Sequence, residues 1–235
     1  MKHTMKLVAL GLSLLLANGS IVYAQDLGKG FEAAQKGDFA KALSEWQPLA
    51  AKGDANAQYN LGYIYEKGQG VTQDYKEAAR FYYLSAAQGF TKAQTNLGAI
   101  YRMGHGVTQD YNAALKWFRL AAAQGDAKAR YNIGLMYDNG EGVTQDYNEA
   151  VRLYLLSAAQ GVVAAQYNLG YMYGKGQGVI QDNVYAHMWF SIAASNGDAN
   201  ASKNRDIAAG KMTAADISKA QDLARGCVRK NYKGC

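Results

Sequence analysis

Apolar side chains recur along this chain at the spacing of helices that bury one face. Ala57, Leu61, Ile64 and Tyr65 form one such stripe, and it returns every 36 residues between positions 53 and 197 without insertion or deletion. Its members are three or four residues apart, which places them on one side of an α-helix. A second stripe follows within each copy. The pattern therefore predicts an all-α chain of paired amphipathic helices.

Aspartate and glycine mark the expected ends of these helices. Asp54 can cap the first helix of a pair, and Gly68 with Gly70 can end it, because glycine tolerates positive φ. Asp74 is placed to cap the second helix, and Glu77 follows at the spacing of a capping box. The same capping box is expected at Asp146 with Glu149.

Four glycines lie inside the first helix of the copies, at Gly62, Gly98, Gly134 and Gly170. Each costs about 1 kcal/mol of helix propensity relative to alanine. A cost repeated in all four copies predicts a close helix crossing there. The glycines do not form a phosphate-binding loop, because no Gly-x-x-x-x-Gly-Lys-Ser/Thr is present.

The repeat period divides the chain into a leader, a divergent N-terminal hairpin, four full repeats and a C-terminal cap. The first hairpin lacks the Gly-x-Gly-Val loop and the last segment loses the Leu-Gly pair, as expected of end units with one free face. The expected boundaries are 1–24, 25–52, 53–88, 89–124, 125–160, 161–196 and 197–235.

Residues 1–24 have the pattern of a secretory signal peptide. A basic start precedes the apolar run Leu7–Ala17, which is shorter than the roughly 20 residues of a membrane span. Small residues at the minus-three and minus-one positions predict cleavage between Ala24 and Gln25. No cysteine follows the run, so a lipid anchor is not expected. The alternative is an uncleaved anchor. Cleavage predicts export to the bacterial periplasm or out of the cell, with no transmembrane span in the mature chain.

The two cysteines, Cys227 and Cys235, suggest a disulfide in an exported chain. Eight residues of continuous helix would hold them about 12 Å apart, which is too far for a bridge. Pairing therefore requires the last helix to end between them, and Asn231 and Gly234 are suitable stops. A redox-active pair is the alternative, but the Cys-x-x-Cys spacing is absent.

The distribution of charge further limits the possible functions. Loss of the leader lowers the excess of basic over acidic side chains from six to four, and this excess lies in residues 198–235. Acidic residues alternate with the basic ones there, which is typical of a solvated helix face. Nucleic-acid binding is therefore not expected.

The repeated pattern closely resembles the Sel-one-like repeat, a relative of the tetratricopeptide repeat. The resemblance implies a right-handed α-solenoid of antiparallel helix pairs that usually serves as an adaptor for protein partners. The departures, Ile133, Leu153, Asn183 and Ser195, are conservative enough to keep this fold. The residues that carry the resemblance in the first copy are Ala57, Gln58, Leu61, Gly62, Tyr65, Gly68, Gly70, Val71, Asp74, Ala78, Phe81, Ala86, Ala87 and Gly89.

The resemblance also implies that the first helix of each repeat lines a concave groove. Tyrosine offers a large contact area with a hydrogen-bonding tip, which suits a peptide groove. The alternative is that some of these tyrosines pack between repeats. The candidate binding residues are Tyr59, Tyr63, Lys67, Tyr131, Leu135, Tyr167 and Tyr171. The other positions of this stripe are Asn56, Lys92, Thr95, Ala99, Met103, Lys128, Asn139, Ala164 and Lys175.

An asparagine column accompanies the stripe, at Asn60, Asn96, Asn132, Asn168 and Asn204. Its amides could hold the main chain of a bound peptide. Alternatively, they form hydrogen bonds that join adjacent repeats, which we favour because a partly buried amide needs a partner.

Catalytic motifs are scarce. Only His105 and His187 follow the leader, in different kinds of element, and no metal-ligand or nucleophile motif occurs. We therefore expect no cofactor and no metal, and a non-catalytic scaffold for a protein or peptide partner. The alternative is a cell-wall-related enzyme or ligand binder, because some exported relatives are described as β-lactamase-like or penicillin-binding. Those relatives carry paired cysteines within repeats, which this chain lacks.

Overall fold

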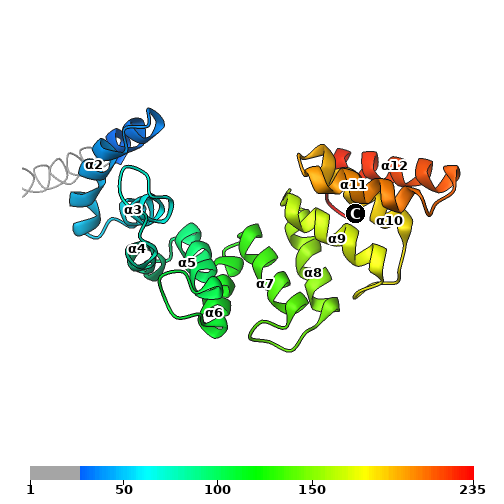
Figure 1. Ribbon diagram of the computed structural model, residues 1–235, viewed down its shortest axis with the longest axis horizontal. Coiled ribbons are helices and arrows are strands. Elements are labelled where there is room, and N and C mark those ends of the chain that lie inside the picture. Colours follow the sequence, from blue (N-terminus) through cyan, green and yellow to red (C-terminus); the bar gives the residue numbers. More distant parts are fainter. Residues whose placement is uncertain (1–26) are drawn as a thin grey trace, which may run out of the picture. The chain divides into compact units, whose positions relative to one another are not determined.

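The computed structural model describes residues 27–235, which form α-helices joined by turns and contain no strand (Figure 1). Residues 27–35 are helical and precede α2 (Phe39–Ala51). The later helices are α3 (Ala55–Lys67), α4 (Tyr75–Ala87), α5 (Thr91–Met103), α6 (Tyr111–Ala123), α7 (Ala127–Asn139), α8 (Tyr147–Ala158), α9 (Val163–Lys175), α10 (Asn183–Ser195), α11 (Ala199–Ala209) and α12 (Ala214–Arg229). The predicted leader and its cleavage site, Ala24–Gln25, lie outside the described residues.

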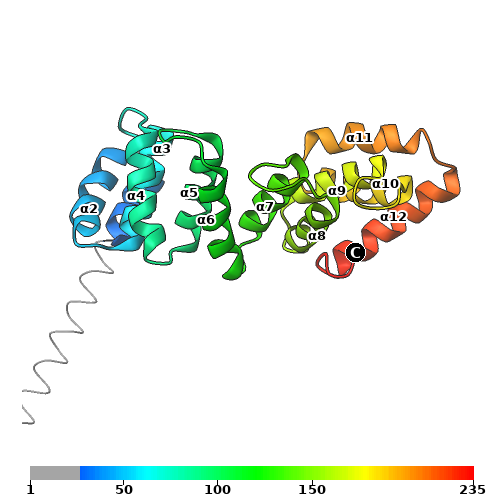
Figure 2. The same cartoon turned by 90° about the horizontal axis from the view of Figure 1, so that it is seen from below.

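The chain forms two compact units, divided after Gln109. In the first unit α3 packs against α2 and α4, and α4 packs against α5. In the second unit α7 packs against α6 and α8, and α9 against α8 and α10. The last two helices, α11 and α12, both contact α10 (Figure 2). Within each unit neighbouring helices thus pack in pairs, which confirms the all-α helix-pair fold.

The helix ends follow the expected chemistry, with one correction. The Asp54 carboxylate accepts from the Ala57 N–H at 2.7 Å, and Gly68 ends α3 at φ 65°. Asp74 caps α4, but the capping box expected with Glu77 is wrong. The Asp74 N–H already donates to the Tyr65 carbonyl at 2.9 Å, because the loop returns to the end of α3.

The carboxylate of Glu77 accepts instead from the Arg80 guanidinium, at 2.8 Å. The third repeat shows the same arrangement, in which Glu149 forms an ion pair with Arg152 and not a capping box. A reciprocal capping box does form at Thr213 and Asp216, at the start of α12.

Three of the glycines within the first helices, Gly62, Gly134 and Gly170, lie directly under aromatic rings of the second helices. A Cβ placed on Gly62 would come within 2.7 Å of the Tyr82 ring, and one on Gly170 within 2.6 Å of the Phe190 ring. Tyr82 is fully buried. The predicted close crossing is therefore confirmed in these three repeats, where an aromatic ring occupies the space of a missing side chain.

The second glycine of each Gly-x-Gly-Val loop has a role that the sequence did not reveal. These glycines have positive φ, but they also lie against the preceding repeat, at the start of its second helix. A Cβ on Gly106 would lie 2.4 Å from the backbone carbon of Tyr75. A Cβ on Gly178 would lie 2.2 Å from the Tyr147 carbonyl oxygen. The loop thus joins adjacent repeats.

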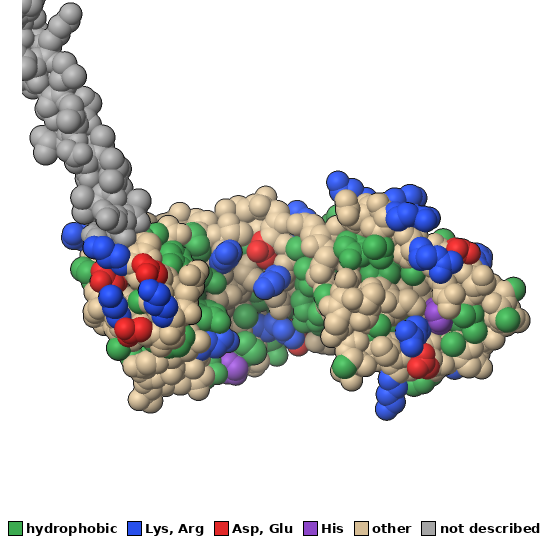
Figure 3. Space-filling view, turned by 90° about the horizontal axis from the view of Figure 1, so that it is seen from above, with side chains coloured by type: hydrophobic (Ala, Val, Ile, Leu, Met, Phe, Trp, Pro, Cys, Tyr) green, Lys and Arg blue, Asp and Glu red, His purple; other side chains and the backbone are tan. Residues whose placement is uncertain are grey.

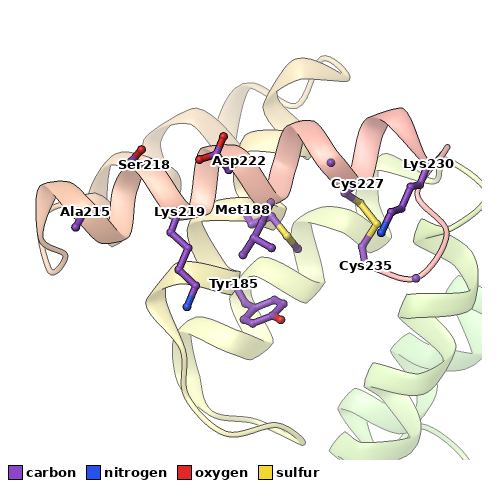
Figure 4. Close-up of a pocket in the computed structure, with 12 residues that line it drawn as sticks. Tyr185, Met188, Ala215, Ser218, Lys219, Asp222, Cys227, Lys230 and Cys235 are labelled. Atoms are coloured by element: carbon purple, nitrogen blue, oxygen red, sulfur yellow. A yellow bond between two sulfur atoms is a disulfide. The ribbon is translucent and has the colours of Figure 1, made fainter.

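A disulfide joins Cys227 to Cys235 with a Cα–Cα distance of 5.5 Å, as the sequence predicts (Figure 4). The chain leaves α12 through positive φ values at Asn231 and at Tyr232, and Gly234 adds a third. The Tyr232 hydroxyl donates to the Asn196 side-chain oxygen at 3.2 Å. The bridged loop therefore ties the C-terminus back to the end of α10.

We expect the double substitution Cys227→Ser, Cys235→Ser to lower the free energy of unfolding of the second unit. Closing a loop of this length stabilises a fold by about 2–3 kcal/mol on a chain-entropy basis. Urea unfolding followed by circular dichroism measures the loss. Wild-type protein treated with dithiothreitol is the control and should show the same loss. An unchanged midpoint in both samples would contradict the structural role.

Candidate functional site

Two tyrosines of the candidate stripe present their rings to solvent. Tyr63 on α3 is 40% exposed and Tyr171 on α9 is 46% exposed. Each has a lysine one turn later whose ammonium lies near its ring, at 5.7 Å for Lys67 and 5.8 Å for Lys175. Each unit therefore offers an aromatic ring beside a cation, a combination suited to binding.

The lysine in the first unit is held in place by a neighbouring acid. Glu66 forms an ion pair with Lys67. The hydrogen bond that the Lys67 ammonium donates to this carboxylate raises the pKa of Lys67, so the ammonium beside Tyr63 stays charged at physiological pH.

The remaining candidate tyrosines are half-buried and pack against the second helices. The Tyr59 ring lies 5.7 Å from Tyr82 and 5.1 Å from Phe90 between ring centroids. Tyr131 lies 5.7 Å from Tyr154. Tyr167 packs in the same way, 5.6 Å from Phe190. Most of each of these three rings therefore packs against neighbouring helices, as the alternative interpretation states, and only the remaining edge reaches the surface.

The other positions of the stripe differ in how far they are exposed. Leu135 is half-buried and packs against the core of the second unit. Met103 is 50% exposed. Thr95 is wrong as a groove residue, because it is 7% exposed and its hydroxyl donates to the Thr91 carbonyl of its own helix. The substitution of tyrosine by threonine there lets the smaller side chain turn inward.

A cavity lies beside each exposed tyrosine. In the first unit, a cavity of about 400 Å³ lies between the N-terminal hairpin and α3, and both Tyr59 and Tyr63 line it. In the second unit, a cavity of about 240 Å³ lies between α9, α10 and α11, with Tyr171 and Lys175 on its wall. In the view of Figure 3, hydrophobic side chains reach the surface of the molecule, with Lys and Arg side chains among them.

The asparagine column mostly joins repeats. Asn204 donates to the Tyr167 hydroxyl of the preceding repeat at 2.7 Å. Asn96 hydrogen-bonds with the hydroxyls of Tyr59 and Tyr82, which belong to the preceding repeat. Asn168 is placed likewise, against the hydroxyl of Tyr154.

Two members of the column depart from this pattern. Asn132 donates instead to the Lys128 carbonyl of its own helix at 2.8 Å. The repeat before it carries Thr95 and Phe118 in place of Tyr59 and Tyr82, so neither position offers a phenol hydroxyl. Asn60 is buried, 7% exposed, and its side-chain nitrogen has no hydrogen-bond partner among residues 27–235.

A second set of buried hydrogen bonds was not foreseen from the sequence. The Tyr82 hydroxyl donates to Glu66 at 2.7 Å, and the Tyr154 hydroxyl donates to Asp138 at 2.9 Å. Burial raises the pKa of Asp138. The acid occupies the same position in two of four repeats, where the others have Arg102 and Gly174, so the repeat pattern gives no constant signal.

A glutamine column also links repeats. Gln58 donates to the Ala50 carbonyl at 3.1 Å, at the end of the preceding helix. Gln94 and Gln166 make the same contact one repeat and three repeats later. The recurrence of glutamine every 36 residues could have predicted this contact from the sequence, although Arg130 interrupts the column.

The two histidines lie apart from the exposed tyrosines. His105 packs against the Tyr75 ring at 4.8 Å between ring centroids. His187 is buried on α10, with Nδ1 3.4 Å from the Ser191 hydroxyl, and burial lowers its pKa. In the described part of the chain, no group of three His, Cys, Asp or Glu side chains is placed to hold a metal ion. No helix within residues 27–235 is long and apolar enough to cross a membrane.

Known structures share this architecture. One is c5321, described as a protective antigen present in uropathogenic Escherichia coli strains and displaying an SLR fold. It is 33% identical with a TM-score of 0.83, over 89% of this chain and 47% of that one. A Sel1 repeat protein from Oxalobacter formigenes is 31% identical with a TM-score of 0.71, over 87% and 88% of the two chains.

A curated relative matches more locally. It is the ERAD-associated E3 ubiquitin-protein ligase component HRD3 of Candida glabrata, 48% identical over 48 residues. This covers 20% of the present chain and 6% of that protein, so the chain spans a small part of this relative and about half of c5321.

A sequence profile of the Sel1 repeat matches four consecutive segments, residues 55–90, 91–126, 127–162 and 163–198. They have the 36-residue period found in the sequence and begin two residues after the boundaries drawn there. Repeats of this kind generally mediate protein–protein interaction, and proteins built from them are generally non-catalytic scaffolds. The matched segments cover more than half of the chain, so this protein belongs to the Sel1 repeat family.

Proposed function

We propose that this protein is an exported scaffold that binds an extended segment of a protein partner through the exposed tyrosines of its first helices. The observation that carries the proposal is the recurrence of one arrangement in both units. Tyr63 and Tyr171 are each exposed, each lies near a lysine ammonium, and each borders a cavity. The two positions are 108 residues apart, which is three repeats.

The chemistry of this surface supports a peptide over a charged small ligand. The aromatic rings offer apolar area, and their hydroxyls and the neighbouring amides offer hydrogen bonds. Tyrosine is enriched among residues that dominate binding energy. In the first unit the half-buried Tyr59 would support a ligand beside Tyr63, and Lys67 provides charge at the edge. In the second unit the half-buried candidates are Tyr131, Leu135 and Tyr167.

Export is supported by two features. The disulfide between Cys227 and Cys235 is typical of proteins that mature in an oxidising compartment. The leader pattern of residues 1–24 indicates secretion through the bacterial inner membrane. Together they favour a partner in the periplasm or outside the cell.

We expect the double substitution Tyr63→Ala, Tyr171→Ala to reduce partner recovery from an envelope extract at least tenfold. Loss of a binding residue of this kind costs about 2 kcal/mol or more. The control is Tyr83→Ala, because Tyr83 is 51% exposed but lies on α4, the second helix of its repeat. Quantitative mass spectrometry of captured proteins measures the change. Equal recovery by wild type and the double variant, with intact folding, would contradict this assignment.

A further inference from the structure

The cavity beside Tyr59 and Tyr63 contains a buried amide without a partner. Asn60 is 93% buried, and its Nδ2 atom has no acceptor among residues 27–235. The same side chain lines the cavity. A buried donor without an acceptor is destabilising and rare in folded proteins, so this position calls for an acceptor supplied from elsewhere.

The reason for the missing partner is visible in the N-terminal hairpin. In later repeats, asparagines of this column meet the hydroxyl of a tyrosine 37 positions earlier, as Asn204 does with Tyr167. The hairpin before Asn60 is shorter than a full repeat, so counting back 37 positions does not find the residue that corresponds to Tyr167. The correspondence is instead given by the contacts between the two helices of the hairpin. Gly30 lies under Trp46 as Gly62 lies under Tyr82, with Cβ distances of 2.2 and 2.7 Å.

This correspondence places Leu27 where Tyr59 stands and Trp46 where Tyr82 stands. Neither side chain has a hydroxyl. The Trp46 Nε1 donates to the Leu27 carbonyl at 3.2 Å, so this pair satisfies itself. Asn60 also makes no bond like that of Asn132, which turns back to a carbonyl of its own helix. The amide therefore stays unpaired within the wall of the cavity.

The remaining lining defines what can enter. The cavity, about 400 Å³, falls within the roughly 300–1,000 Å³ typical of ligand pockets. Its wall is largely aromatic, and none of its lining residues carries a charge. The aromatic lining residues are Phe31, Phe39, Trp46, Tyr59 and Tyr63. Such a site suits a neutral apolar group with a carbonyl acceptor next to it.

We propose that this cavity holds one large apolar side chain of an extended partner peptide, whose adjacent main-chain carbonyl accepts a hydrogen bond from Asn60 Nδ2. This proposal rests on the proposed function, and it specifies which group of the partner one part of the tyrosine surface binds. The uncharged wall disfavours a chain terminus or an acidic side chain, because a buried charge there would lack a counter-ion. The occupant is therefore an internal segment of a partner protein.

The test uses the mature full-length chain labelled with ¹⁵N and capped pentapeptides, acetyl-Gly-Ser-Xaa-Ser-Gly-amide, where Xaa is Phe, Leu, Lys or Asp. Nuclear magnetic resonance follows the side-chain amide signals of Asn60 and, as an internal reference, of Asn132. We expect the Phe and Leu peptides to move the Asn60 signals and to bind at least fivefold more tightly than the Lys and Asp peptides.

Two variants separate hydrogen bonding from folding. Asn60→Leu removes the donor, and loss of one such bond weakens binding about fivefold. Leu27→Tyr keeps Asn60 but supplies the hydroxyl that later repeats use. We expect it to raise the melting temperature and to weaken peptide binding at least fivefold, because the donor is then occupied within the protein.

The possible results distinguish the role of Asn60 from the proposed function of the tyrosine surface. Peptide binding that shifts Tyr63 signals but is unchanged in both variants would overturn the role of Asn60 and leave the tyrosine surface intact. Absence of binding by all four peptides to wild-type protein would overturn both proposals. Binding of the Lys or Asp peptide more tightly than the Phe peptide would overturn the neutral apolar specificity.

Discussion

We expect Gly178→Ala to lower the free energy of unfolding of the second unit by about 3 kcal/mol. Gly178 has φ 67°, and a left-handed conformation costs an L-residue about 1–2 kcal/mol. The added methyl would also lie 2.2 Å from the Tyr147 carbonyl oxygen. A backbone atom cannot rotate away, so the two segments must separate, and such overpacking costs about 1–3 kcal/mol.

Gly140→Ala is the matched control. Gly140 has φ 72° in the same unit, but its nearest neighbour, the Gln145 Cβ, would lie at an ordinary 3.5 Å. It should therefore show the backbone cost alone, about 1–2 kcal/mol. Urea unfolding of both variants measures the difference. Equal destabilisation would mean that the loop does not press on the preceding repeat.

The second large effect concerns the ring that covers a helix glycine. Tyr154 is fully buried, and its ring occupies the space above Gly134, where a Cβ would approach it to 2.8 Å. We expect Tyr154→Ala to destabilise the second unit by about 3–5 kcal/mol, the usual cost of deleting a buried aromatic ring. Thermal and urea unfolding of the purified protein measure this.

Tyr154→Phe separates the ring from its hydroxyl. It keeps the contact with Gly134 but removes the hydrogen bond to Asp138, and such a bond is worth about 0.5–1.5 kcal/mol, or somewhat more with a charged acceptor. A phenylalanine variant as unstable as the alanine variant would show that the Asp138 bond, and not the ring, holds the helix pair together.

Much of the fold follows from the sequence because four copies repeat the same choices. The glycine at position 62 and its equivalents predict a close crossing from their cost alone, and the structure places aromatic rings over Gly62, Gly134 and Gly170. The disulfide geometry could also be predicted, because eight residues of helix exceed the reach of a bridge. Periodicity made the glycine inference robust, since several positions supported it.

The site could be predicted less well, because exposure depends on neighbours that the pattern does not show. Tyr59 and Tyr63 are one helical turn apart, yet Phe90 and Tyr82 cover the first and leave the second open. The isolation of Asn60 depends on which residues of a shortened hairpin replace the tyrosines of a full repeat. Only the packed structure aligns them, through Gly30 and Trp46.

Site-specific photocrosslinking tests the central claim, that a partner protein lies on the first helices, most directly. A photoreactive phenylalanine derivative would replace Tyr63 in one strain and Tyr83 in another, since both rings are exposed in the same repeat but on different helices. We expect a discrete adduct with one envelope protein from position 63 and none from position 83. Adducts from position 83 alone, or from neither position, would contradict this account.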